Sequence, residues 1–153
     1  MTTGLTGGCA CGNVRYECSE RPLVQMICHC RDCQRASGSA FAASLVVPSD
    51  RLQLFETSLR FFEMNAESGN TKQGGFCKDC GSPILAKLPG APLVTFLTAS
   101  SLDDPSDFSP ALDVWVSWAQ PWQRLHADTL KFDKNPSRKA MWAPIKAYFA
   151  SRT

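Results

Sequence analysis

The sequence predicts a mainly β fold, in which short antiparallel strands form one domain that ends in a single helix. Runs of alternating apolar and polar residues recur along the chain between turn-forming residues, as in half-buried strands. Helical spacing of apolar residues occurs only in the C-terminal tail. The chain has 153 residues, of which 44% are hydrophobic, and no linker or repeat divides it. We therefore expect one domain over residues 1–153.

Alternation, β-rich runs and turn residues together place the expected strands. Residues 59–64 and 71–76 are expected to pair as a hairpin, because Ser68-Gly69-Asn70 between them is a turn sequence. Pro48 is expected to end the strand before it. The other expected strands cover residues 14–17, 23–27, 41–47, 52–55, 84–88, 93–98 and 112–116.

The expected helix covers about residues 136–150. Asn135 is its expected N-cap and Pro136 its first residue, while Pro144 is expected to kink or restart it. We expect its apolar face to pack on the sheet, and a homodimer surface is the alternative. That face consists of Met141, Trp142, Ile145, Tyr148 and Phe149.

Charge and segment patterns exclude several classes of partner. The formal net charge of +2 gives no electrostatic footprint for nucleic acid or an anionic membrane surface. The sequence shows no secretory signal pattern and no apolar run long enough to cross a bilayer. We therefore expect a cytoplasmic protein whose thiols stay reduced, so that a disulfide framework is the less favoured interpretation of the eight cysteines.

Four cysteines are spaced to hold one tetrahedral zinc. Cys9 and Cys11 form a Cys-x-Cys pair between glycines, and Cys77 and Cys80 form a Cys-x-x-Cys pair before Gly81. Zinc takes four such donors, each about 2.3 Å from the metal. Four thiolates leave no position for water or substrate, so this zinc is expected to be structural. The alternative is that these are buried, reduced thiols.

Three further cysteines, Cys28, Cys30 and Cys33, lie within six residues and could face a second zinc. Three thiolates leave a fourth position open, as in catalytic zinc sites. Zinc at such a position lowers the pKa of a bound thiol or water, or polarises a carbonyl oxygen. The sequence therefore predicts a catalytic site carried by these three residues through the metal.

Polar residues around the three cysteines are candidates for substrate binding. Arg31 and Arg35 could bind the carboxylates of an anionic substrate, or simply balance thiolate charge or lie in solvent. Ser37 and Ser39 could hydrogen-bond a ligand or merely form the turn.

Other reactive or aromatic residues have expected roles outside the metal sites. His29 is expected to point away from the sulfurs if its segment is extended, and to support them rather than bind metal. His126 is expected to be an ordinary histidine, and Cys18 a small buried hydrophobe, with a transient ligand role as the alternative. Trp115 and Trp118 cannot share one face of a regular strand, so one could face a pocket, although core packing is the favoured role.

The cysteine strings together resemble the glutathione-dependent formaldehyde-activating enzyme family, which also contains the centromere protein V domain. The resemblance runs from about Gly7 to about Trp118. It rests on Gly7-Gly8-Cys9-x-Cys11-Gly12, Cys28-His29-Cys30-x-x-Cys33-Gln34 and Phe76-Cys77-x-x-Cys80-Gly81-Ser82-Pro83.

The resemblance implies a β-rich, tent-like fold with two zinc ions per chain. It implies a structural zinc on Cys9, Cys11, Cys77 and Cys80, and a second zinc on Cys28, Cys30 and Cys33. In the namesake activity, glutathione and formaldehyde combine to S-hydroxymethylglutathione, and the family is commonly described by the reverse reaction, as carbon–sulfur lyases. The resemblance therefore implies a zinc-dependent lyase whose partners are a small thiol such as glutathione and a small aldehyde. The alternative is a non-catalytic zinc-binding module or a glutathione or aldehyde carrier.

Overall fold

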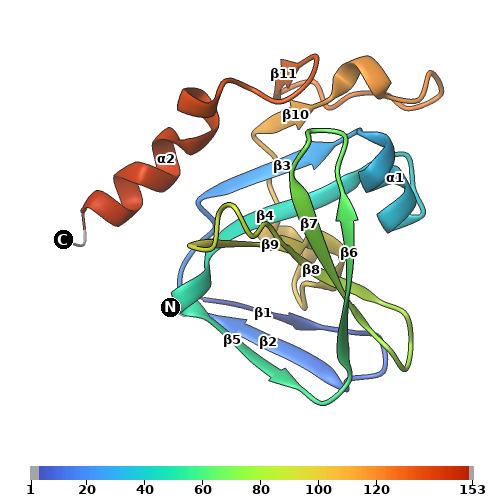
Figure 1. Cartoon of the computed structure of the whole chain (residues 1–153), viewed down its shortest axis with the longest axis vertical. Helices are drawn as coiled ribbons and strands as arrows, with labels where there is room; N and C mark the ends of the chain where they lie inside the picture. Colours follow the sequence, from blue (N-terminus) through green and yellow to red (C-terminus); the bar gives the residue numbers. More distant parts are fainter. Residues whose placement is uncertain (1–3, 152–153) are drawn as a thin grey trace.

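The computed structural model describes residues 4–151, and these residues form two β-sheets, two α-helices and several short 3-10 helices (Figure 1). In the C-terminal helix, the side chains of Arg138, Pro144, Ile145, Tyr148 and Phe149 lie outside the description. The predicted mainly β fold is confirmed, with eleven strands among the described residues. No helix in this part of the chain is long and apolar enough to span a membrane.

The smaller sheet has three antiparallel strands, in the order β1 (Leu5–Gly8), β2 (Val14–Cys18) and β5 (Leu52–Glu56). The sequence did not predict β1, because two of its four residues are glycines and give no alternation. Gly7 is needed there: a Cβ atom on it would lie 2.3 Å from both the Tyr16 hydroxyl and the Ser101 carbonyl oxygen. Tyr16 is itself fully buried between the sheets.

The larger sheet has eight strands in the order β11-β10-β3-β4-β9-β8-β7-β6. Neighbouring strands are antiparallel except at β10, which runs parallel to both β3 and β11. The predicted hairpin forms from β6 and β7, and β4 ends at Pro48 as predicted. The strands are β3 (Val24–Cys28), β4 (Ala42–Pro48), β6 (Leu59–Asn65), β7 (Thr71–Cys77), β8 (Pro83–Lys87), β9 (Val94–Thr98), β10 (Leu112–Val114) and β11 (Leu130–Phe132).

The helices differ from the prediction in two ways. An unpredicted helix, α1 (Arg31–Ser37), follows β3 directly and ends at Gly38 in the left-handed conformation. The C-terminal helix, α2 (Arg138–Ala150), continues through Pro144 and is capped by Ser137, whose hydroxyl accepts the Ala140 N–H at 3.2 Å. The 3-10 helices are η1 (Ser49–Arg51), η2 (Ala99–Ser101), η3 (Pro105–Asp107) and η4 (Val116–Trp118).

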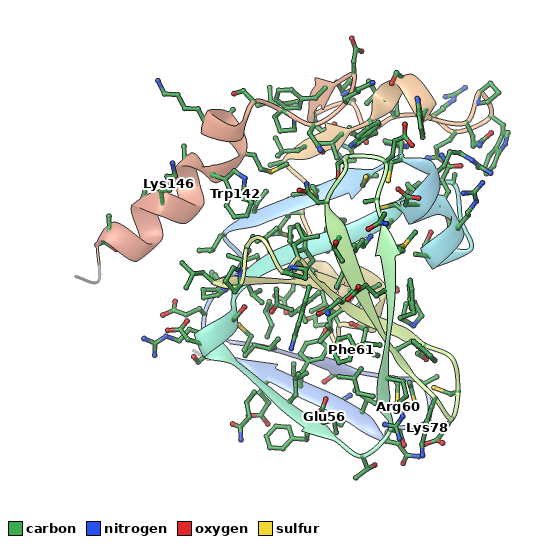
Figure 2. The ribbon with its side chains drawn as sticks, viewed as in Figure 1. Glu56, Arg60, Phe61, Lys78, Trp142 and Lys146 are labelled. Carbon is green, nitrogen blue, oxygen red and sulfur yellow. The ribbon has the colours of Figure 1, made fainter. Side chains whose placement is uncertain are left out.

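Two apolar clusters form the core, and each contains part of one cysteine group. Cys9 and Cys77 lie in the first cluster, which packs β1 and β2 against the larger sheet. Cys30 and Cys33 lie in the second, which Met141 and Trp142 of α2 also contact. Trp142 projects from α2 toward β3 (Figure 2). The apolar face of α2 therefore packs on the sheet at these two residues, while the predicted contacts of Ile145, Tyr148 and Phe149 fall outside the described side chains.

Candidate metal centres

The first candidate centre joins the two sheets. Cys9 and Cys11 lie in the turn from β1 to β2, while Cys77 ends β7 and Cys80 lies in the turn to β8. All four sulfurs lie within 4.8 Å of one another, with Cys9 to Cys11 at 3.5 Å and Cys11 to Cys77 at 3.7 Å. Tetrahedral zinc with sulfur bonds of about 2.3 Å separates its sulfurs by about 3.8 Å. These four residues therefore fit a zinc ion.

Hydrogen bonds prepare this centre for a cation. The Val14 N–H donates to Cys9 Sγ at 3.2 Å, and the Ser82 hydroxyl lies 3.1 Å from Cys80 Sγ. Hydrogen bonding by Ser82, from its hydroxyl and its backbone, lowers the pKa of Cys80 to about 5. Ser82 Oγ also accepts the Ala10 N–H at 3.1 Å, which ties the two cysteine turns together.

The second candidate centre forms where β3 meets α1. Cys28 ends β3, Cys30 caps α1 and Cys33 lies in its first turn, so that their sulfurs come within 4.8 Å of one another. The Cys33 N–H donates to Cys30 Sγ at 3.4 Å. No fourth His, Cys, Asp or Glu of the described chain joins this group. The structure thus brings the three predicted cysteines together and leaves one side of the group free of such ligands.

The three sulfurs compete for negative charge. Hydrogen bonds from Cys28 and Cys33 lower the pKa of Cys30 to about 2, and the same interactions with Cys30 and Cys33 raise the pKa of Cys28. One thiolate is therefore stabilised by two neighbouring thiols. A bound cation would allow all three to ionise, and soft thiolate donors suit zinc. This donor set fits a zinc ion, with metal binding expected to release protons.

His29 lies between two of these cysteines but points away from them, as the alternation predicted. Its ring is 1% exposed, and Nε2 lies 2.6 Å from Oδ1 of Asp113 on β10. Asp113 is fully buried and also accepts a hydrogen bond from the Thr129 hydroxyl. The backbone carries the connection further, because the His29 N–H donates to the Val114 carbonyl at 3.0 Å. This buried network fixes the segment between Cys28 and Cys30 to β10.

A cavity of about 720 Å³ opens beside the three cysteines. Lys72 of β7 lies on its wall and donates to Cys33 Sγ at 3.7 Å. The sequence gave no signal for Lys72, since it comes 39 residues after Cys33 on a hairpin arm. Most of the remaining wall is apolar. It includes Met26, Val46, Phe62, Phe76, Phe96, Trp115, Met141 and Trp142.

The candidate substrate residues of α1 divide between its two faces. Ser37 lies on the cavity wall, one helical turn after Cys33, but its hydroxyl donates to the Phe41 carbonyl at 2.7 Å. Arg31 and Arg35 are one turn apart on the other face, both exposed, and Arg31 donates to Gln34. Neither arginine is part of the cavity wall, and nor is Ser39. Because the sequence did not predict the helix, it could not separate these faces.

Trp115 and Trp118 pack in the second core cluster, as expected, but the strand expected over residues 112–116 ends before them. The strand β10 ends at Val114, and Trp115 has a φ of 60°, so the chain turns and the rings of Trp115 and Trp118 meet edge to face at 5.3 Å. Trp115 lines the cavity. Cys18 is buried in the first core cluster and joins neither cysteine group, while His126 is exposed and its Nδ1 accepts the Asp128 N–H.

The fold and the two cysteine groups define a mainly β protein that could bind two metal ions, at a closed group of four thiols and an open group of three. The chain belongs to the glutathione-dependent formaldehyde-activating enzyme family, whose sequence pattern matches residues 4–118. A crystal structure of a Rhodobacter sphaeroides protein shares the fold, with a TM-score of 0.53 and 20% identity over 67% of this chain and 94% of that one. No curated protein matches the chain.

Proposed function

We propose that this protein is a zinc-dependent carbon–sulfur lyase of the cytoplasm, which adds a thiol such as glutathione to a small aldehyde or catalyses the reverse. The main support is the group formed by Cys28, Cys30 and Cys33, which has three soft ligands, no fourth one among the described residues, and a cavity beside it. The family match supports the thiol and the aldehyde as reactants.

Cys9, Cys11, Cys77 and Cys80 would hold a structural zinc, and Cys28, Cys30 and Cys33 a second one. Bound at the second centre, zinc would supply positive charge that keeps a substrate thiol ionised or polarises the carbonyl group. Lys72 is the cation that we assign to an anionic group of the thiol, because its ammonium group reaches Cys33 Sγ. In the addition, the thiol sulfur bonds to the carbonyl carbon, and the thiol proton ends on the carbonyl oxygen.

The direct test is NMR exchange spectroscopy of glutathione with formaldehyde in the presence of the zinc-loaded protein. We expect exchange faster than the spontaneous rate, and the Cys30→Ser variant should lose that acceleration. Thiol addition to formaldehyde is fast without help, so the comparison with the spontaneous rate decides the result. Tight binding of glutathione without acceleration would instead identify a carrier or a binding module.

The role of Lys72 has its own test. The Lys72→Ala variant should raise KM for glutathione by roughly ten-fold with a smaller effect on kcat, because a charge contact made in the bound state is lost. Lys139→Ala, at an exposed position on α2, is the matched control. Equal KM values for both variants would exclude Lys72 from thiol binding. A homodimer remains a prediction that neither variant addresses.

A further inference from the structure

The cavity beside the three cysteines is much larger than formaldehyde requires. Its volume of about 720 Å³ falls in the range of roughly 300–1,000 Å³ that is typical of pockets for drug-sized ligands. Apolar and aromatic side chains from β3, β4, β6, β7 and β9 line it, and so do Trp115 and two residues of α2. Cys30 and Cys33 themselves belong to the apolar cluster that includes Met26, Val46 and Trp115 of this wall.

Charged side chains gather at one end of this cavity. The only charged residues on its described wall are Asp32, Glu67 and Lys72. They lie where the tip of the β6–β7 hairpin approaches α1 (Figure 1), and the Glu67 N–H donates to Asp32 Oδ2 at 2.8 Å. This end of the cavity suits a charged, peptide-like thiol. The rest of the described wall carries no charged side chain, so it suits an apolar group.

The C-terminal segment builds part of the apolar wall. Asn135, Pro136, Met141 and Trp142 line the cavity, and all four lie beyond residues 4–118, which carry the family pattern. Met141 and Trp142 pack against the same apolar cluster as Cys30 and Cys33. This wall is thus a feature of the chain that the family pattern does not describe.

The same segment holds Trp115 in an unfavourable backbone conformation. A φ of 60° is uncommon for a bulky residue, and such residues concentrate at ligand sites. Three contacts maintain it: the Trp115 N–H donates to the Lys134 carbonyl at 3.2 Å, its Nε1 donates to Asn135 Oδ1 at 2.9 Å, and Lys134 Nζ lies 5.6 Å from the ring centroid. The segment therefore both lines the cavity and fixes the aromatic ring of Trp115, which follows the residue paired with Cys28.

We propose that the aldehyde used by this protein carries an apolar group of about the size of a phenyl ring, and that Met141 and Trp142 select it. This inference rests on the proposed function and specifies its substrate class. The thiol lies at the charged end with Lys72, and the apolar group of the aldehyde lies against the C-terminal wall. The bonds formed and broken are those of the thiol addition given above, so no further reactant is needed.

Two stable thioethers test this inference by binding. S-(2-phenylethyl)glutathione stands for the adduct of phenylacetaldehyde, and S-methylglutathione for the adduct of formaldehyde. Titration calorimetry on the zinc-loaded full chain should show S-(2-phenylethyl)glutathione binding at least about ten-fold more tightly, as expected for burying an aromatic ring. Exchange spectroscopy should likewise show greater acceleration for glutathione with phenylacetaldehyde than with formaldehyde, each relative to its spontaneous rate.

Variants of the cavity wall test which residues cause the preference for the aromatic thioether. Trp142→Ala should reduce the affinity ratio of the two thioethers to about three-fold or less, because it removes the largest side chain of the C-terminal wall. Phe62→Ala should also reduce the ratio, and since Phe62 is 41% exposed this variant keeps the test valid if Trp142→Ala fails to fold. Lys146→Ala, at an exposed position of the same helix, is the matched control and should leave the ratio unchanged.

Three outcomes would overturn the inference in distinguishable ways. Equal affinity for the two thioethers, together with catalysed exchange of formaldehyde, would overturn the substrate class and leave the proposed function in place. No binding of either thioether and no catalysed exchange with either aldehyde would overturn both. A ten-fold preference that persists in both Trp142→Ala and Phe62→Ala would contradict the assignment to this cavity.

Discussion

At the scale of single residues, the His29–Asp113 pair fixes the backbone that carries Cys28 and Cys30. Both side chains are buried, and the pair lies between β3 and β10, two strands that run parallel. The Thr129 hydroxyl donates a hydrogen bond to Oδ2, the second carboxylate oxygen of Asp113. Because buried polar groups are costly without partners, the pair holds His29, and with it the flanking cysteines, in one position.

Removing Asp113 should therefore destabilise the fold. We expect Asp113→Ala to lower the free energy of unfolding by about 2–4 kcal/mol, since it leaves His29 and Thr129 without their buried partner. Asp113→Asn keeps an acceptor for His29 and should cost less. Urea unfolding measures both, with the exposed Asp133→Ala as control. A change below about 0.5 kcal/mol for Asp113→Ala would contradict the role of the pair.

Ser82 acts at the four-cysteine centre through the protonation of Cys80. Its hydrogen bonds lower the pKa of Cys80 to about 5, so the thiolate is present above that pH and is lost as the pH falls through it. Metal and proton compete for the same sulfur. The preformed thiolate would therefore let this centre keep a bound metal ion to a lower pH.

The Ser82→Ala variant should release metal from this centre at higher pH than the native protein. The shift should be roughly half a pH unit or more, because the Cys80 pKa returns toward that of an ordinary thiol. Zinc release into a chromogenic chelator, followed from pH 7 downward, measures the midpoint. Ser109→Ala, at an exposed position, should behave as the native protein does. An unchanged midpoint in Ser82→Ala would show that the hydrogen bond does not control metal retention.

At the scale of elements, β1 depends on the close approach of Gly7 to the core. A methyl group there would overlap both the Tyr16 side chain and the Ser101 carbonyl, and Tyr16 is tied to Ser101 by a 2.9 Å hydrogen bond. We expect Gly7→Ala to reduce the free energy of unfolding by about 1–3 kcal/mol. Gly90→Ala is the control, because no atom lies within 4 Å of a Cβ placed at Gly90. Similar stabilities in thermal unfolding would refute this account of β1.

The elements also show what the sequence could and could not predict. Alternation located β2, in which buried residues alternate with more exposed ones. A β-rich run that ends at Pro48 located β4, and the turn sequence Ser68-Gly69-Asn70 located the β6–β7 hairpin. These patterns missed β1, with two glycines, and β11, with three residues. They missed α1 as well, since seven residues that begin beside three cysteines carry no helical period of their own.

Some residues of the candidate site could also be predicted from the sequence, and others could not. The cysteine groups were predictable because ligand spacing within a turn is local and chemically specific. Lys72 and Trp142 were not, because strand pairing and the docking of α2 bring them to the cavity from distant parts of the sequence. The arginines of α1 looked suitable by their charge, but the helix turns them to the outside.

At the scale of the whole molecule, the four-cysteine centre fastens the two sheets together. Cys11 of the smaller sheet's first turn and Cys77 of the larger sheet lie 66 residues apart in sequence and 3.7 Å apart at their sulfurs. A hydrogen bond of 2.9 Å between Asn13 and Asp79 joins the same two turns. A metal ion there would close a long loop in the unfolded chain and stabilise the native state accordingly.

Loss of the metal site at the four-cysteine centre should therefore lower stability more than loss of the three-cysteine site. We expect Cys77→Ser to lower the midpoint of thermal unfolding by several degrees more than Cys30→Ser does, because Cys77 is fully buried and joins two sheets. Cys28, Cys30 and Cys33, in contrast, lie within one short segment, where β3 meets α1. Excess chelator should lower the midpoint of the native protein and of Cys30→Ser by similar amounts. A larger loss in Cys30→Ser would reverse the assigned roles.

The central claim is that the chain carries two separate metal centres, one structural and one open to substrate. Elemental analysis of zinc per chain tests it most directly, on the native protein, Cys30→Ser and Cys77→Ser. We predict about two zinc ions in the native protein and about one in each variant, with acceleration of thiol exchange lost in Cys30→Ser. About one zinc in the native protein, unchanged in Cys30→Ser, would contradict the second centre and the proposed chemistry with it.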